Sequence, residues 1–126
     1  MRCAILDDYQ NVALGLADWS AIAADVEIQV FNEHLGDEAA VAKALAEFEV
    51  VAIMRERTPF PRSLFEKLPK LKLLVTTGMG NLSVDLAAAK EHGVVVSGTD
   101  ILKYPTAELT WGLVLAATRR IPQECR

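Results

Sequence analysis

The stretch Leu73-Leu74-Val75-Thr76-Thr77-Gly78-Met79-Gly80-Asn81 decides the fold, because it joins a continuous apolar run to a glycine turn. Such a run is typical of a strand buried on both faces of a parallel sheet. The segment that follows has a helical pattern that Ser83 or Asp85 can cap, and Gly93 stands where a left-handed residue would end the helix. Val94-Val95-Val96 then forms another apolar run. The order predicted is strand, turn, helix, strand.

The same alternation extends toward the N-terminus. Cys3–Leu6 and Val50–Met54 are continuously apolar and predict buried strands, whereas Val26–Val30 alternates and predicts an edge strand with one face in water. Pro61–Leu68 predicts a short helix, and Val12–Trp19 predicts a weaker one that contains Gly15. A further helix is indicated by apolar residues at i, i+3, i+4 and i+7, namely Val41, Ala44, Leu45 and Phe48.

Five strands that alternate with helices predict an α/β fold with an open, doubly wound sheet. An edge strand in second position fits the flavodoxin-like, five-stranded parallel order 2-1-3-4-5. Ligands of such sheets bind beyond the carboxyl ends of the strands. The candidate binding loops are therefore Asp7–Tyr9, Asn32–Leu35, Arg55–Thr58, Thr77–Ser83 and Gly98–Tyr104.

The composition is that of one globular domain. The 126 residues are 52% hydrophobic and 24% charged, with a formal net charge of −4. No basic cluster exceeds Arg119-Arg120, so a nucleic-acid partner is not expected, because phosphate binding needs a basic face. The longest apolar run, Leu113–Ala117, is too short for a membrane span, and no signal-peptide core precedes the first strand. Cys3 and Cys125 lack C-x-x-C spacing, and we expect reduced thiols in a cytoplasmic protein.

The glycine turn is the first candidate site. Glycines at 78 and 80 let the backbone approach a ligand closely, and free amides at a helix N-terminus attract a carboxylate or a phosphate. A tight turn that merely needs positive φ is the alternative. The spacing Gly78-x-Gly80-x-x-Ser83, with Asp100 further on, also imitates a dinucleotide fingerprint, but that motif normally follows the first strand of its domain.

The loop after Val50–Met54 is the second candidate. Arg55 and Arg57 could clamp a carboxylate or phosphate, unless Glu56 simply pairs with one of them in a solvated loop. Asp7 and Asp8 are expected to form a turn. His34 and His92 are expected to be structural. No residue can be named as a catalytic acid or base, and no metal-ligand spacing occurs.

The last helix is unusual because it has no polar face. From Leu109 to Ala117 every residue except Thr110 and Gly112 is apolar. A helix that is apolar all round must be covered all round. We therefore expect the uncovered side to need a further domain or a second subunit, or to make the protein prone to aggregation.

These motifs resemble the D-isomer-specific 2-hydroxyacid dehydrogenases, and most closely their D-3-phosphoglycerate-dehydrogenase-like branch. The resemblance is carried by Leu71–Asn81, by Val84–Lys90 with Gly93–Val96, and by Thr106–Trp111 with the run to Pro122. It implies a flavodoxin-like substrate domain over residues 1–104 and an interdomain linker helix over 105–126. It also implies an NAD(H)- or NADP(H)-binding Rossmann domain, which we expect to lie outside these residues together with the family's catalytic arginine, acid and histidine.

In such a family the glycine loop holds the substrate carboxylate, and the loop after the third strand lines the substrate's other end. The implied substrate-binding residues are Arg55, Arg57, Thr58, Thr77, Gly78, Met79, Gly80 and Asn81. The implied reaction is hydride transfer between the nicotinamide and C2 of a D-2-hydroxy or 2-oxo acid. We expect the 126 residues alone to bind no cofactor tightly, to show no turnover and to self-associate through helix 106–120. A binding module without catalysis and a flavin-binding flavodoxin are the alternatives.

Overall fold

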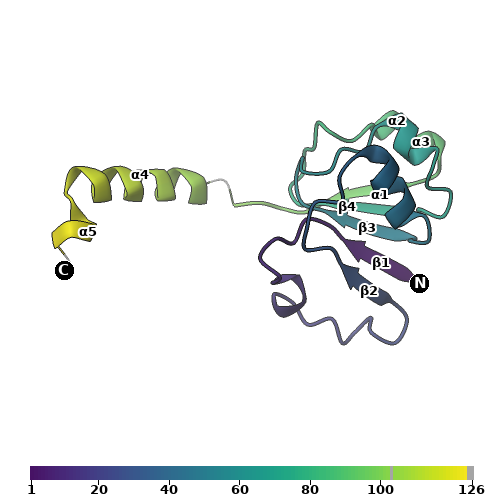
Figure 1. Ribbon diagram of the computed structural model, residues 1–126, viewed down its shortest axis with the longest axis horizontal. Helices are drawn as coiled ribbons and strands as arrows, with labels where there is room; N and C mark the ends of the chain where they lie inside the picture. Colours follow the sequence, from purple (N-terminus) through teal and green to yellow (C-terminus); the bar gives the residue numbers. More distant parts are fainter. Residues whose placement is uncertain (103, 125–126) are drawn as a thin grey trace.

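The computed structural model describes residues 1–102 and 104–124. A parallel sheet in the order β2-β1-β3-β4-β5 forms its centre (Figure 1), which confirms the predicted flavodoxin-like α/β fold. The alternating segment is the edge strand β2, as predicted, with Glu27 and Gln29 in solvent. The five strands are β1 (Arg2–Ile5), β2 (Glu27–Val30), β3 (Val50–Ile53), β4 (Leu73–Thr76) and β5 (Val95–Gly98).

Three helices cover one face of this sheet: α1 (Glu38–Leu45), α2 (Arg62–Phe65) and α3 (Leu86–Glu91). The strand residues beneath them are the best buried of the molecule, with exposed fractions of 0–2% for Ala4, Val51, Ile53 and Leu74. Leu45 of α1 and Phe65 of α2 are equally buried and close the core from above, together with Phe60, Leu64 and Ala88. Burial of these apolar side chains holds the loops at the strand ends in fixed positions.

The helix ends follow the capping residues. Asp37 Oδ1 accepts a hydrogen bond from Ala40 N at 2.9 Å, and Asp85 Oδ1 accepts one from Ala88 N at 2.8 Å. Asp85 rather than Ser83 therefore caps α3. Gly93, with φ +71°, follows the end of α3 in the left-handed conformation that was predicted for it.

Two predictions about the opposite face are wrong. The expected helix Val12–Trp19 is a single 3-10 turn, η1 (Ala13–Gly15), because the Asp8 carboxylate accepts hydrogen bonds from the amides of residues 12 and 13 and so fixes a turn. The apolar runs are also not buried on both faces, since buried residues alternate with half-buried ones in β3 and β4. The strand β5 is more exposed than either. It lies at the edge of the sheet, and the Val95 side chain is 63% exposed.

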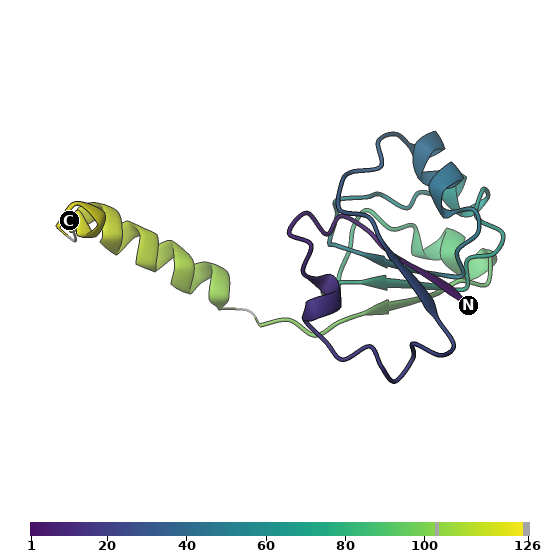
Figure 2. The same ribbon diagram turned by 60° about the horizontal axis from the view of Figure 1, so that its bottom comes forward.

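A long helix, α4 (Pro105–Thr118), extends away from the sheet, and the short α5 (Ile121–Glu124) follows it (Figures 1 and 2). No described residue of α4 is buried, and its apolar side chains are among the most exposed of the molecule. Trp111 is 67% exposed and Leu113 62%. The predicted apolar helix therefore forms, and within the described chain most of its surface is uncovered. No helix in residues 1–102 and 104–124 has the length and hydropathy that a membrane crossing requires.

Candidate functional site

Arg55 is the first residue of the site, and its backbone is unusual. It follows β3 and has φ +54°, a left-handed conformation that residues other than glycine rarely adopt. The glycine loop, residues 77–83, holds this conformation by bonding both the amide and the carbonyl of Arg55. The Arg55 amide donates to Thr77 Oγ1 at 3.1 Å, and the Arg55 carbonyl accepts from Asn81 Nδ2 at 2.7 Å. Such local strain persists only where surrounding contacts enforce it, and it concentrates at functional sites.

Asn81 acts as a clamp for the loop that contains it. Its Nδ2 also donates to Thr76 Oγ1 at 2.9 Å, and its Oδ1 accepts from Ser83 N at 3.0 Å and from Ser83 Oγ at 2.6 Å. Thr77, through its hydroxyl, contacts Arg55 N and Met54 Sδ. The side chains of Thr77 and Asn81 therefore shape the loop, rather than presenting free polar groups to a ligand.

Gly78 is required where the two loops approach each other. Its φ is +94°, and a Cβ at this position would lie 2.7 Å from Arg55 Nη1 and 3.5 Å from Ile101 Cγ2. The Arg55 guanidinium thus lies directly over the backbone of the glycine loop. The amide of Gly78 is not free for a ligand, because it donates to Thr99 Oγ1 at 2.9 Å.

The free donors of the loop begin at Met79 and Gly80 and continue through Asn81 and Leu82. Within the described part of the chain, their amides donate to no protein acceptor, and the Met79 side chain is 73% exposed. The expectation that these amides belong to a helix N-terminus is wrong, since α3 begins only at Leu86. An anion at this loop would therefore be bound by turn amides, with the Arg55 guanidinium nearby.

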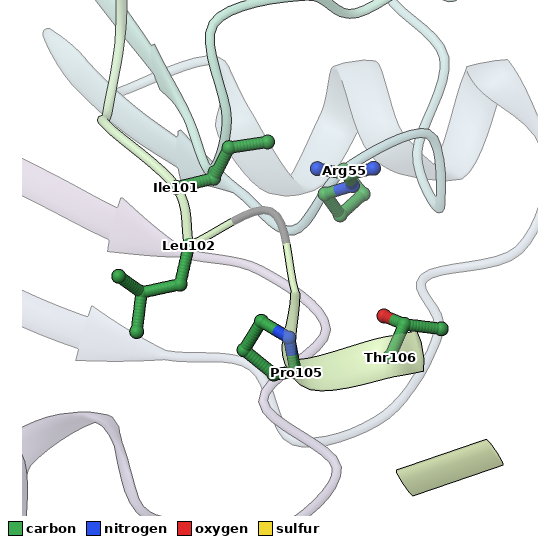
Figure 3. A pocket seen from close by; sticks show the side chains of 5 residues that line it. All are labelled: Arg55, Ile101, Leu102, Pro105 and Thr106. Carbon is green, nitrogen blue, oxygen red and sulfur yellow. The ribbon is translucent and has the colours of Figure 1, made fainter. Parts of the chain in front are cut away.

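An open hollow of about 750 Å³ adjoins this loop (Figure 3). Arg55 supplies its cationic wall, Ile101 and Leu102 an apolar wall, and Pro105 and Thr106 at the start of α4 the remaining side. The hollow therefore lies between the carboxyl end of the sheet and the helix that leads away from it. A small organic anion with an apolar portion suits this combination.

Arg57 and Thr58 follow Arg55 along the chain but are directed elsewhere. Thr58 is 2% exposed, and its hydroxyl donates to Asp7 Oδ2 at 2.7 Å. Arg57 Nη1 donates to the Asp7 carbonyl at 2.8 Å, and its guanidinium lies 4.7 Å from the centre of the Tyr9 ring. Neither residue lines the hollow beside Gly78. The hydrogen bond from the Tyr9 hydroxyl to Asp7 raises the pKa of Tyr9 above its ordinary value.

The chain is similar to known proteins of one family. Residues 3–124 match the family described as D-isomer specific 2-hydroxyacid dehydrogenase, catalytic domain. This chain belongs to that family. As a 2-hydroxyacid dehydrogenase domain it is similar to the D-3-phosphoglycerate dehydrogenase of Methanocaldococcus jannaschii, with 43% identity over 74 residues, which cover 58% of this chain and 14% of the relative. The predicted resemblance is confirmed.

Two further 2-hydroxyacid dehydrogenase relatives extend the match. The hydroxypyruvate reductase of Thermotoga maritima is 33% identical over 96 residues, which cover 75% of this chain and 31% of the relative. The crystal structure of the phosphoglycerate oxidoreductase of Vibrio cholerae has a TM-score of 0.86 and 38% identity, over 97% of this chain and 38% of that one. The chain therefore spans less than two-fifths of the length of each of these relatives.

Several residues of this candidate site are not evident from sequence alone. Thr99 and Ile101 contribute to it from the segment after β5, which the sequence marks only as one of five candidate loops, and Thr106 contributes from the start of α4. Asp7 was expected to be a turn former, yet its carboxylate is buried and bonded to Thr58. The sequence indicates this contact only through position, because Asp7 and Thr58 follow adjacent strands, and parallel strands end at the same edge of the sheet.

Other candidate chemistry has little structural support. No group of three or more metal-binding side chains gathers anywhere in residues 1–102 and 104–124. Cys3 is buried and unpaired, and burial raises the pKa of its thiol. Cys125 lies outside the described residues. The loop Gly78–Ser83 does not form a dinucleotide cradle, since it follows the fourth strand and α3 starts at Leu86.

Proposed function

We propose that this domain binds the substrate of an NAD(P)-dependent dehydrogenase that acts on D-2-hydroxy acids or 2-oxo acids. The observation that carries the proposal is the run of free amides that begins at Met79 and Gly80 and continues to Leu82, beside the Arg55 guanidinium at the carboxyl ends of β3 and β4. Two amides in one turn suit the two oxygens of a carboxylate. Arg55 then faces the opposite end of a short acid, where a second anionic group would be favoured.

The hollow supports binding but not proton transfer. Among its described lining residues, none is a His, Asp or Glu, and Arg55 stays protonated at any relevant pH. We therefore propose that these residues orient the substrate and that the catalytic acid–base pair belongs to another part of the parent enzyme. The 126 residues alone are predicted to show no turnover.

The cofactor is assigned to the parent enzyme and not to these residues. NAD or NADP requires a glycine turn that opens directly into a helix, and the turn at Gly78 does not. We propose a boundary near residue 104, with residues 105–126 leading into a nucleotide-binding domain. The exposed apolar surface of α4 supports this, because Leu109 and Trp111 need a covering partner.

A chimera tests the proposed function. The matching segment of the Vibrio cholerae phosphoglycerate oxidoreductase is replaced by this chain, and oxidation of NADH is followed with several 2-oxo acids. We expect turnover by the chimera and none by the 126 residues alone. Arg55→Gln in the chimera should raise KM. A chimera that folds and binds NADH but reduces no 2-oxo acid would favour a binding module without catalysis instead.

A further inference from the structure

Asp7 is a buried charged residue that the proposed substrate site does not use directly. It follows β1, its side chain is only 1% exposed, and its φ is +58°. Its neighbour Asp8 is explained by its own turn, since the Asp8 carboxylate accepts from the amides of Val12 and Ala13. Asp7 makes no such local bond. A carboxylate that is buried on a strained backbone is costly, so contacts outside its own turn must account for its position.

The contacts of Asp7 run to two other segments and to Tyr9 in its own segment. Oδ2 accepts from the Thr58 hydroxyl at 2.7 Å, and Oδ1 accepts from the Tyr9 hydroxyl at 3.0 Å. His34 Nδ1 lies 3.5 Å from Oδ1, and the Asp7 carbonyl accepts from Arg57 Nη1 at 2.8 Å. Hydrogen bonds to a carboxylate are stronger than neutral ones and hold their geometry more tightly. Asp7 therefore ties together the ends of β1, β2 and β3.

The segment between Met54 and Thr58 is consequently held at both ends. On one side, Thr77 and Asn81 bond the backbone of Arg55. On the other, Asp7 bonds the side chains of residues 57 and 58. Few residues separate the two anchor points, so freeing the second anchor would let the left-handed Arg55 relax.

We propose that Asp7 is a positioning residue for Arg55: its carboxylate acts through Thr58, its backbone carbonyl holds Arg57, and Asp7 itself touches no substrate. By fixing the far end of the loop, it keeps the Arg55 guanidinium over Gly78 and aimed at the distal end of the bound acid. The role of Arg55 in binding the substrate rests on the proposed function. The control of the Arg55 side-chain position by Asp7 does not.

The variants separate this role from general stability. Asp7→Asn removes the negative charge while keeping a residue that tolerates the left-handed conformation. Thr58→Val removes only the hydroxyl that donates to Asp7, and Thr58→Ser restores a hydroxyl. Asp8→Asn is the matched control, because Asp8 bonds its own turn and not the Arg55 loop. If Asp7→Asn does not fold, the pair Thr58→Val and Thr58→Ser makes the test alone.

The measurement is NMR of the full 126-residue chain with two probes, D-3-phosphoglycerate, which has a distal phosphate, and pyruvate, which has none. We expect Asp7→Asn and Thr58→Val to weaken D-3-phosphoglycerate binding about tenfold, to leave pyruvate binding unchanged, and to shift the Arg55 amide and Nε–H signals. Thr58→Ser should recover most of the loss, and Asp8→Asn should show none.

Unchanged Arg55 signals in Asp7→Asn and Thr58→Val would overturn the proposal, as would an equal loss of both probes. A different failure belongs to the proposed function. Suppose that the unmodified chain binds neither probe, while the Arg55 signals of the ligand-free Asp7→Asn variant still differ from those of the unmodified chain. The positioning role of Asp7 then stands, and the assignment of the substrate site is wrong.

Discussion

The guanidinium of Arg55 lies over Gly78, with Nη1 2.7 Å from the point at which a side chain at position 78 would begin. The two residues follow adjacent strands, β3 and β4, and the amide of Thr77 extends that pairing by donating to Ile53 O. Among the described residues that line the hollow, Arg55 has the only cationic side chain, and this contact joins it to the turn with free amides.

Gly78→Ala should displace Arg55 and destabilise the domain. The new methyl group would overlap Nη1, and φ +94° is strained for alanine, so we expect a loss of about 1–3 kcal/mol in the free energy of unfolding. Urea unfolding measures it. Gly80→Ala is the control, because a Cβ at position 80 would meet nothing within 4 Å. Equal stability of the two variants would contradict the expectation.

Gly98→Ala should disturb the same loop from the side of β5. A Cβ at this position would lie 2.7 Å from Gly78 O and 2.9 Å from Met79 Cα, and backbone atoms cannot rotate away. We expect a destabilisation of about 1–3 kcal/mol with changed amide resonances at Met79 and Gly80. An unfolding midpoint and spectrum like those of the unmodified chain would show that the loop has room to move.

The ion pair between α2 and α3 should make stability depend on acid pH. Arg62 Nη2 donates to Glu91 Oε1 at 3.0 Å, and this bond lowers the pKa of Glu91. A lowered pKa means that the contribution is present above the ordinary glutamate pKa of about 4.3 and is lost as pH falls through the lower value of the folded state.

Urea unfolding of Arg62→Gln between acid and neutral pH tests this dependence. The difference in the free energy of unfolding between this variant and the unmodified chain should be small, because both side chains are about half exposed. Near neutral pH the difference should be constant. It should shrink as the solution becomes acidic. Lys43→Gln, at an exposed position of α1, is the control. A difference that persists unchanged at the acid end would contradict the assignment.

The helix α4 should mediate self-association of the isolated chain. Trp111 and Leu115 lie one turn apart on the helix and are 67% and 53% exposed. We expect sedimentation velocity at about 100 µM to show dimers or larger species, because a large exposed apolar patch normally finds a partner. Trp111→Glu combined with Leu115→Glu should sediment as a monomer. A monomeric unmodified chain would contradict the prediction.

The order of the strands could be predicted from sequence because it depends on local patterns. The alternation at Val26–Val30 identifies an edge strand, and Gly93 marks a helix end, whatever the rest of the chain does. The failure at Val12–Trp19 has a specific cause, since the Asp8 carboxylate takes the first amides that a helix would have used. Such competition between side chain and helix is not visible in an apolar pattern.

The site could be predicted only in part, for a related reason. The free amides of Met79 and Gly80 are local to one turn, and the glycines reveal them. The division between Arg55 and Arg57 is not local. It depends on Asp7, which lies 50 positions before Arg57 and meets it only when β1 and β3 pair in register. Sequence alone treats two arginines of one loop alike.

The most direct measurement is a titration of the ¹⁵N-labelled chain with pyruvate and, separately, with methyl pyruvate, which lacks the carboxylate. We expect millimolar pyruvate to shift the amide signals of Met79 and Gly80, while the signals of Tyr9 and His34 stay in place. Methyl pyruvate should leave the loop unchanged. Equal shifts with both compounds, or no shift at Met79 and Gly80 with pyruvate, would contradict the role of this turn in binding the substrate carboxylate.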